Sequence, residues 1–529
     1  MWGTGNPINC TSHLTASQTA PADFDPRSWI GQDLTTGDMT ISNSVYFENL
    51  TLDANSTLTI LKTGKLFING LFNNQGSVIM DSDSNEFSAF ITANIGGTGT
   101  FTYNRWAASI NTNDLIAAPF AGQTFSDFLT HNSGIINTNP NDVTQNLFGN
   151  FNNNSGSYES FSSTSSITLD AGVGYRVGTD SGATLSFNGV FQTADQLIPI
   201  SIGSDPTYGR WNLVGNPFPA YIELNTFFNS NSSVLDSNYA AVYTYDGSGW
   251  TTYNSANSSG VLIAPGQGFF LASKTGGGDV SFTTAMQSVA YSDDFISGEV
   301  LQPDTYLKVV MSNGNDIFDT EIFLHANTTL GMDIGFDAGL FVGQNPTQSI
   351  YSHLAYENTG LKLDMPSIPI EIDGTVVIPL GVEIQANSQV SIGLDSEVFL
   401  NNLHVYLEDT IANTWTYLND QFYNFSPTTA LQGSGRFYLH LSNQALDISS
   451  FKKNDFVLVS SAGQIIIYGN LKAGDQITIF NIQGQQLKQN IIAEHTNQSI
   501  LSAHSFAPGI YIVHINSRQN LERYKILVK

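Results

Sequence analysis

The chain has 529 residues, and its composition excludes several classes of protein. It carries 18 Lys and Arg against 45 Asp and Glu, a formal net charge of -27, and only 12% of its residues are charged. A surface this acidic repels phosphate backbones, so we expect no nucleic-acid partner. The single cysteine, Cys10, excludes an intramolecular disulfide framework. No apolar run approaches the roughly 18 residues of a membrane-spanning helix, so we expect no transmembrane segment.

The first residues give the compartment only indirectly. Residues 1–4 have neither a basic stretch nor an apolar core, so no signal peptide is visible. Few lysines, many Asn, Ser, Thr and Gly, and dense aromatic residues are typical of extracellular bacterial β-proteins. We therefore expect a mature chain whose signal peptide has been removed; a cytosolic protein is the alternative.

Period-2 alternation and turn residues recur almost throughout, which predicts an all-β fold of tandem β-sandwich modules. Residues 1–100 form a β-rich N-terminal region, with short strands at regular spacing from about residue 35. A short β-solenoid and half of a sandwich are the two alternatives for this region. Helical segments are expected only at 124–130 and 224–230.

An internal duplication follows, with motifs that recur in the same order about 95 to 105 residues later. The spacing is too long for solenoid coils and gives too few copies for a propeller. We therefore predict two related β-modules, residues 101–195 and 196–294, or two halves of one larger sandwich. The paired motifs are Tyr103-Asn104-Arg105-Trp106 with Tyr208-Gly209-Arg210-Trp211, Ala118-Pro119-Phe120 with Asn216-Pro217-Phe218, Gly172-Val173-Gly174-Tyr175 with Gly266-Gln267-Gly268-Phe269, and Leu185-Ser186-Phe187 with Val280-Ser281-Phe282.

Two further domains complete the predicted organisation. Strand patterns separated by turns predict a β-sandwich at residues 295–448. A polar, basic bridge at 449–455 marks the boundary to a C-terminal domain at 449–529. From residue 451 onward there are eight basic and four acidic residues, a charge of +4, against -31 for residues 1–450. This asymmetry indicates a module with its own partner.

The C-terminal domain is predicted to be a small, seven-stranded, immunoglobulin-like antiparallel sandwich. The expected strands are 456–459, 464–468, 476–479, 485–489, 498–501, 509–515 and 524–528.

Two stretches of this tail carry a family resemblance. Residues 474–487 read Gly-Asp-Gln-Ile-Thr-Ile-Phe-Asn-Ile-Gln-Gly-Gln-Gln-Leu, and residues 507–513 read Ala-Pro-Gly-Ile-Tyr-Ile-Val. Both, with the basic final strand, resemble the type A C-terminal sorting domain of the type IX secretion system. The resemblance covers about 75 residues and implies export across the outer membrane of a Bacteroidota-type cell, with the secretion machinery as partner. The motif positions are Gly474, Gly484, Pro508, Gly509, Tyr511, Val513, Lys525 and Lys529.

We expect most of these motif residues to be structural. Gly484 and the pair Pro508-Gly509 suit turns, and the alternating apolar residues suit a core. Exposed lysines and the last strand are the better candidates for recognition, and strand addition at a sheet edge is one way to achieve it.

No catalytic signature is present. The sequence lacks Gly-x-Ser-x-Gly, His-Glu-x-x-His, a Walker loop and a dinucleotide fingerprint, and its nine histidines show no metal-ligand spacing. We therefore predict a protein that is not an enzyme. A carbohydrate-active enzyme with two carboxylates stays as the alternative.

Calcium is the one metal that the sequence suggests. Asp81, Asp83 and Asn85 alternate as oxygen ligands do in calcium loops. However, Glu86 stands where the turn glycine belongs and Thr92 where the closing Glu belongs, so solvated loop acids are the stronger interpretation. No other cofactor is expected.

Four aromatic residues suggest a carbohydrate site. Tyr243, Tyr245, Trp250 and Tyr253 flank the turn at 246–249, where rings could stack on the apolar faces of sugars. The alternation also explains them as cross-strand pairs in a sandwich core, and this interpretation is favoured.

Together these features predict an adhesin-like or structural protein that type IX secretion delivers to the cell surface or the medium, where its ligand is a protein or a glycan. Binding or degradation of extracellular polysaccharide is the first alternative. A subunit of a surface fibre is the second.

Overall fold

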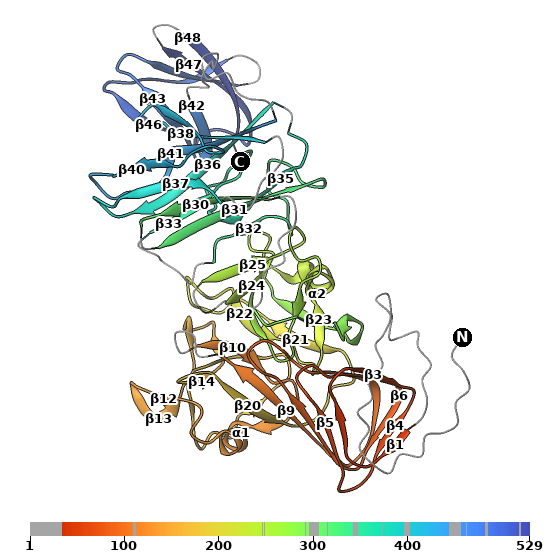
Figure 1. Cartoon of the computed structure of the whole chain (residues 1–529). Helices are drawn as coiled ribbons and strands as arrows, with labels where there is room; N and C mark the ends of the chain where they lie inside the picture. The colour runs from red at the N-terminus through yellow and green to blue at the C-terminus, as the bar shows by residue number, and fades with distance from the viewer. Residues whose placement is uncertain are drawn as a thin grey trace, which may run out of the picture. The chain divides into compact units, whose positions relative to one another are not determined.

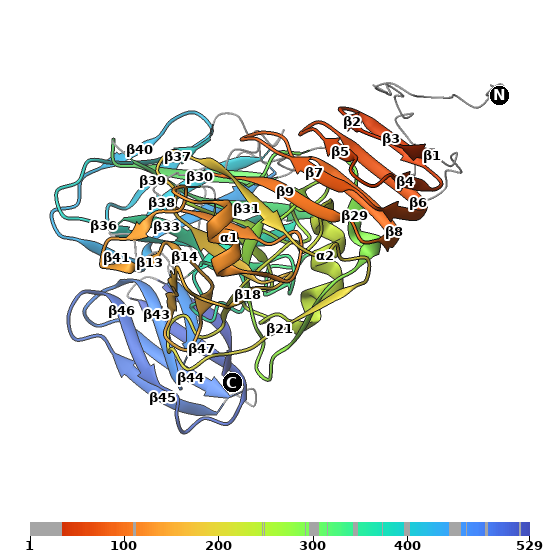
Figure 2. The same cartoon turned by 90° about the horizontal axis from the view of Figure 1, so that it is seen from below.

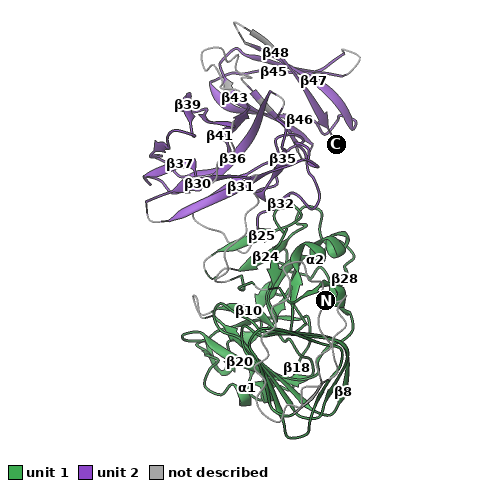
Figure 3. Ribbon diagram, turned by 45° about the vertical axis from the view of Figure 1, so that its right-hand side comes forward, with its two compact units in different colours: residues 1–301 green, residues 302–529 purple. Residues whose placement is uncertain are grey.

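The computed structural model describes residues 34–108, 113–245, 247, 249–290, 292–295, 306–314, 316–341, 348–372, 374–395, 403–443, 456–461, 463–481, 485–517 and 520–528. The chain divides into two compact units, Met1–Leu301 and Gln302–Lys529, which Figure 3 shows in different colours. Strands dominate both, as the all-β prediction requires. Two α-helices occur in the described residues, α1 (Phe125–His131) and α2 (Leu224–Asn231), which confirms both predicted helical segments.

The first unit begins with parallel strands stacked in successive coils. Two layers run through it, one ordered β2-β5-β7-β9 and the other containing β1, β3, β4, β6 and β8; Figures 1 and 2 show them in red and orange. The strands are β1 (Leu34–Thr36), β2 (Met39–Ile41), β3 (Ser44–Phe47), β4 (Leu50–Leu52), β5 (Thr57–Ile60), β6 (Lys65–Asn74), β7 (Ser77–Asp81), β8 (Ala89–Gly97) and β9 (Thr100–Ala107).

Parallel pairing places like residues of successive coils above one another. The register aligns two ladders of buried side chains, Met39, Leu58, Val78 and Phe101, and Ile41, Ile60, Met80 and Tyr103. Stacked coils make parallel pairs, whereas a sandwich half built from hairpins makes antiparallel ones. The strand direction in this region is therefore that of a solenoid.

The last coil strand, β9, passes into the duplicated region by pairing antiparallel with β20. The first repeat contains β10 (Asp114–Ala117), β11 (Gln123–Thr124), α1, β12 (Thr138–Asn139), β13 (Asp142–Asn146), β14 (Phe148–Gly149), β15 (Phe151–Asn152), β16 (Ser157–Tyr158), β17 (Phe161–Ser162), β18 (Thr168–Leu169), β19 (Gly174–Val177) and β20 (Ala183–Asn188). The second contains β21 (Gln196–Ile200), β22 (Trp211–Gly215), β23 (Tyr221–Glu223), α2, the 3₁₀ helix Ser232–Val234, β24 (Val242–Tyr245), β25 (Trp250–Tyr253), β26 (Leu262–Ile263), β27 (Gly268–Ala272), β28 (Gly278–Phe282), the 3₁₀ helix Thr284–Met286 and β29 (Gln287–Ser288).

The two repeats share strand pairings as well as sequence. In the first, β10 pairs antiparallel with β19, so that Ala117 lies opposite Gly174; in the second, β22 pairs with β27, so that Gly215 lies opposite Gly268. A third strand continues each sheet, β14 beside β19 and β24 beside β27. The motif pairs found in the sequence therefore occupy equivalent places in the fold.

A buried asparagine joins helix and strand in both repeats. Asn132 follows α1, and its side-chain amide donates to the backbone oxygens of Phe128 (2.8 Å) and Ser186 (3.1 Å), while its Oδ1 accepts from the Ser186 amide (2.8 Å). Asn231 at the end of α2 repeats the arrangement with Phe227 and Ser281. Each asparagine closes a helix end and fixes the helix to the neighbouring strand.

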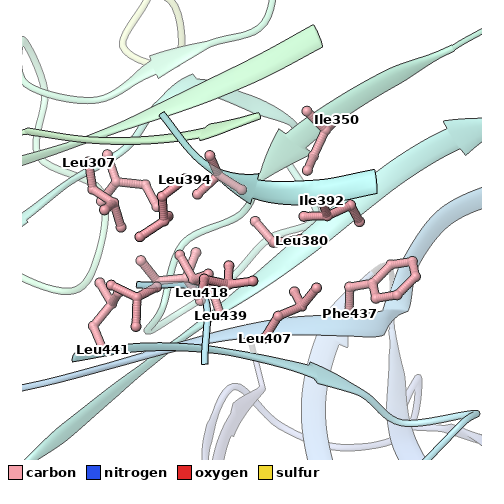
Figure 4. Packing of buried hydrophobic residues seen from close by; sticks show 14 of the residues in the cluster. Leu307, Ile350, Leu380, Ile392, Leu394, Leu407, Leu418, Phe437, Leu439 and Leu441 are labelled. Carbon is pink, nitrogen blue, oxygen red and sulfur yellow. The ribbon is translucent and has the colours of Figure 1, made fainter. Parts of the chain in front are cut away.

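The second unit contains a sandwich of two sheets. One is ordered β35-β31-β30-β37-β40 and the other β32-β34-β33-β36-β41-β38-β39. Their facing apolar side chains form one core, part of which Figure 4 shows. The strands are β30 (Tyr306–Ser312), β31 (Ile317–His325), β32 (Ala338–Gly339), β33 (Ser349–Ser352), β34 (Leu363–Met365), β35 (Ser367–Pro369), β36 (Thr375–Ile384), β37 (Val390–Leu394), β38 (His404–Asp409), β39 (Thr414–Tyr417), β40 (Tyr423–Phe425) and β41 (Leu431–Ser442).

The tail forms its own two-sheet sandwich with seven antiparallel strands. One sheet is ordered β42-β43-β46 and the other β45-β44-β47-β48, and the apolar residues between them form a separate core. Each predicted strand overlaps an observed one. These are β42 (Phe456–Ser461), β43 (Gln464–Leu471), β44 (Gln476–Asn481), β45 (Gln486–Ile491), β46 (Thr496–Ser502), β47 (Gly509–Ser517) and β48 (Asn520–Val528).

Candidate functional site

The contact between the two repeats is reciprocal. The Ala117 amide of the first repeat donates to the Gly266 oxygen of the second (2.7 Å), and the Gly215 amide of the second donates to the Gly172 oxygen of the first (3.0 Å). Single β-bridges repeat the exchange, Ile116 with Gln267 and Val214 with Val173. Equivalent residues thus exchange roles across the contact, as they do about a two-fold axis between two copies.

Glycines permit this close approach. A Cβ added to Gly215 would lie 2.5 Å from the Cβ of Ala117, and one added to Gly268 would lie 2.8 Å from the backbone carbon of Leu115. Gly174 is the equivalent of Gly268 in the first repeat, and it faces the side chain of Leu213, the equivalent of Leu115. The paired Gly-x-Gly motifs of the sequence are therefore contact residues between repeats.

Next to this contact, aromatic side chains of both repeats meet. Phe151 and Tyr158 form a cross-strand pair between β15 and β16, with ring centroids 5.4 Å apart. Tyr245 and Trp250 form the equivalent pair between β24 and β25, also at 5.4 Å. Phe270 of β27 contacts Phe151 at 5.1 Å and Trp250 at 5.6 Å. We call these five residues the aromatic cluster.

The structure separates the four aromatic residues that the sequence grouped as a carbohydrate site. Tyr243 is fully buried against Trp211, with ring centroids 4.8 Å apart. Tyr253 is 3% exposed and lies opposite Val242, and residues opposite one another in an antiparallel pair point to the same face of the sheet. Both belong to the core on the face away from Tyr243. Only Tyr245 and Trp250 are half-buried, so only they retain ring surface for a ligand. Asp246 and Ser248 of the turn between them lie outside the described residues.

Sequence reasoning missed the partners of Tyr245 and Trp250. Phe151 and Tyr158 contact the same Phe270 ring as Trp250, and the Arg176 guanidinium lies 4.4 Å from the centre of the Tyr158 ring. Extending the internal duplication would have aligned Phe151 with Tyr245 and Tyr158 with Trp250. That signal was weak, because β15 and β16 are only two residues long.

Asp83, one of the three residues predicted as calcium ligands, pairs with a lysine. Asp83 and Glu86 both pair with the Lys62 ammonium, the latter at 2.9 Å. Oδ1 of Asp83 accepts the backbone N–H groups of Asn85 (3.1 Å) and Glu86 (3.0 Å), whereas Asp81 accepts a hydrogen bond from Asn104 (2.8 Å). Within the described residues, no group of three or more His, Cys, Asp or Glu side chains is arranged to hold a metal ion. Lys62 supplies positive charge to the two acidic side chains that it pairs with.

A buried ionic network is the second feature that sequence reasoning missed. Arg105 of β9 is fully buried, with its Nη1 3.5 Å from Asp114 and its Nη2 3.4 Å from Asp294 and 3.1 Å from Gln267 Oε1. Burial raises the pKa of Asp114, the Arg105 charge opposes that rise and the Asp294 charge adds to it. The network joins three separate parts of the first unit, since Asp294 follows the second repeat.

Most motif residues of the tail have structural places. Gly474 has a φ of 96°, a conformation that favours glycine, and its amide donates to the Ile492 oxygen (2.8 Å). Tyr511 and Val513 are buried in the tail core, and Gly509 begins β47 directly after Pro508. Lys525 is exposed on β48. Gly484, Lys529 and the boundary at 449–455 lie outside the described residues, as does Cys10.

Comparison with protein families accounts for nearly the whole chain. A family model described as a domain of unknown function, DUF8693, matches residues 27–441. The chain belongs to this family. The DUF8693 match includes the coils, both repeats and the strands of the larger sandwich. A second model, the secretion system C-terminal sorting domain, matches residues 454–529 and confirms the resemblance read from the tail. The sorting domain directs this DUF8693 protein across the outer membrane, to the cell surface or the medium.

Other similarities of the DUF8693 protein are distant. No curated protein shows significant similarity to the chain. A solved structure described as the BSP domain of a biofilm-associated protein aligns with 64% of this chain and 96% of its own length, at 7% identity and a TM-score of 0.15. Among the described residues, no helix has the length and apolar character needed to cross a membrane.

Proposed function

We propose that this secreted chain is a non-enzymatic, adhesin-like or structural protein of the cell surface. The sorting domain supplies the route of export, and the acidic body supplies the surface that is displayed. Filled cores support this proposal over catalysis. In each unit, large apolar side chains occupy the space between the layers, as Figure 4 shows for the second unit.

The environment of the carboxylates carries the argument. A glycosidase needs two carboxylates on either side of a bond that the substrate can reach. Asp114 and Asp294 approach one another around Arg105, but their exposures are 0% and 2%. Two other acidic pairs of the described residues share a lysine: Asp83 and Glu86 with Lys62, and Asp319 and Glu321 with Lys308. A further pair, Asp333 and Asp337, has its buried member, Asp337, hydrogen-bonded to the backbone N–H groups of Asp333 and Ser367. These arrangements suit structural ion pairs and hydrogen bonds better than acid–base chemistry.

Binding of extracellular polysaccharide is the second candidate, and one observation favours it. The half-buried rings of Tyr245 and Trp250 form one pair, Phe151 and Tyr158 form the equivalent pair of the other repeat, and the Phe270 ring contacts both pairs. Adjacent rings with partly exposed faces can stack on sugars.

The test measures binding and hydrolysis on the same protein. The purified full chain is applied to glycan and matrix-protein arrays, with and without calcium, and incubated with each bound polysaccharide while reducing ends are counted. Selective binding without release of reducing ends is expected. Release of reducing ends would contradict the non-enzymatic proposal. Light scattering at high concentration tests the fibre alternative. A monomeric mass would contradict that alternative.

A further inference from the structure

The aromatic cluster contains one position at which the repeats differ in chemistry. Arg176 in β19 lies opposite Leu115 and Gly149, and Phe270 in β27 lies opposite Leu213 and Tyr243. These pairings make Arg176 and Phe270 equivalent. Where the second repeat has an apolar ring, the first has a guanidinium.

Arg176 differs from the two other arginines described in the first unit. Arg105 pairs with Asp114 and Asp294, and Arg210 pairs with Asp236. Among the described residues, no carboxylate lies within ion-pair distance of Arg176, although the protein as a whole carries a net charge of -27. Burial lowers the pKa of Arg176, yet an arginine stays protonated in proteins.

The position of the guanidinium suits a carboxylate ligand. One face of the group lies over the Tyr158 ring at 4.4 Å, which leaves the N–H donors in its plane available. A planar guanidinium binds a carboxylate through two parallel hydrogen bonds, and partial burial strengthens them.

Hydrogen bonds restrain two of the elements that carry the rings of the cluster. The turn after Phe151 is fixed to the second repeat, because Asn153 Nδ2 donates to the Ser201 oxygen (2.9 Å) and the Ser204 amide donates to Asn154 Oδ1 (3.1 Å). The Tyr245 hydroxyl donates to the Gly247 oxygen (2.7 Å). A site whose side chains are already fixed loses less entropy on binding.

We propose that Arg176, together with Tyr158, Tyr245 and Trp250, binds a uronic acid residue of an acidic polysaccharide. The guanidinium holds the sugar carboxylate, while the half-buried rings contact the apolar face of the pyranose. This inference rests on the adhesive function proposed above and gives it a ligand class.

The test compares acidic sugars with neutral counterparts. Oligomers of galacturonic, glucuronic and mannuronic acid, and the same oligomers after reduction of their carboxyl groups, are titrated into the full chain by calorimetry. At least one acidic oligomer should bind, and its reduced form should bind about tenfold to a hundredfold more weakly, the ratio expected when a hydrogen bond to a charged group is lost. Failure of every acidic oligomer to bind, or equal binding of the reduced forms, overturns the proposal.

Three variants assign the binding to this site. Arg176→Gln should reproduce the loss seen with reduced oligomers, Arg176→Lys should lose less, and Trp250→Ala should weaken acidic and reduced oligomers alike. Arg523→Gln, on the exposed surface of the tail, is the control and should bind as the wild type. Unchanged thermal unfolding checks that each variant is folded. Wild-type affinity in Arg176→Gln overturns the proposal.

A parallel assay separates this proposal from the broader function. Beads coated with the wild type and with Arg176→Gln are tested for attachment to the surfaces that the arrays identify. If both attach equally to an acidic glycan, the Arg176 site is wrong while the adhesive function stands. If neither attaches to any surface, the adhesive function itself fails.

Discussion

At the scale of single residues, each repeat contains one buried asparagine that joins its helix to one of its own strands. Asn132 and Asn231 each join the end of a short helix to a strand through three hydrogen bonds. Both are almost fully buried, so water cannot replace a lost partner. Both repeats therefore use a buried asparagine to connect the helix end to the neighbouring strand.

Replacing Asn231 with Ala should therefore destabilise the first unit. The change leaves the Ser281 amide and two backbone oxygens without their partner, at a cost of about 1 to 3 kcal/mol. Calorimetry of the full chain measures the shift of the unfolding transition. Asn229→Ala, on the exposed face of the same helix, is the control. Equal shifts in the two variants would contradict this role.

The Arg105 network gives a prediction about pH. Burial raises the pKa of Asp114 above its unfolded value of 3.8. The folded state then holds this proton more tightly, so the contribution of Asp114 to stability falls as pH rises from about 4 through the folded-state pKa. Asp114→Asn, which stays neutral, should gain stability relative to the wild type between pH 5 and pH 8.

The measurement is the difference in unfolding temperature between variant and wild type at each pH. Taking the difference removes the contribution of other titrating groups. Asp180→Asn, at an exposed position in the same repeat, should show no such trend. A constant difference for Asp114→Asn across the range would show that this carboxyl does not titrate as its burial implies.

At the scale of elements, backbone contact between the repeats depends on glycine. Gly215→Ala would place a methyl group 2.5 Å from the Cβ of Ala117, with backbone on the other side of the contact, so neither repeat can yield without moving a strand. We expect a loss of about 1 to 3 kcal/mol, as for other overpacked sites. Urea unfolding of the full chain measures it.

Gly37→Ala is the matched control for that substitution. Its added Cβ would meet no heavy atom closer than 3.7 Å, and its φ is not in the left-handed region. If Gly215→Ala unfolds at the same urea concentration as Gly37→Ala, the repeats do not depend on close contact at this point.

Some of these elements could be predicted from the sequence and others could not. All seven tail strands, both helices and the duplication could be predicted, because local alternation, capping residues and repeated motifs record them directly. The direction of the first strands could not, since Leu58 and Val78 alternate identically in parallel and antiparallel sheets. The candidate site was found in part. Tyr245 and Trp250 belong to a local hairpin, whereas Phe151 and Arg176 reach them only through the contact between repeats.

At the scale of the whole molecule, charge follows the division into body and tail. The first 450 residues carry a charge of -31 and the last 79 carry +4. The sorting domain has its own core, so its fold needs few contributions from the body. The export signal therefore lies in a domain with its own core.

Deletion of residues 452–529 should leave the body folded but retained inside the outer membrane. The measurement is fractionation of cells with a type IX secretion system, followed by limited proteolysis of the retained protein to check its fold. A fusion of residues 449–529 to an unrelated β-protein is the matched control and should be exported. Unchanged secretion of the truncated chain would contradict the role of the tail.

The reciprocal contact between repeats also implies a history. A single-repeat ancestor that carried both halves of the contact could have made it with a second copy of itself, as an ordinary symmetric dimer. Such a dimer must have the same residue at both equivalent positions. Fusion of the two copies into one chain removes that constraint, and the pair of Arg176 and Phe270 is a divergence that a symmetric dimer of identical chains cannot have.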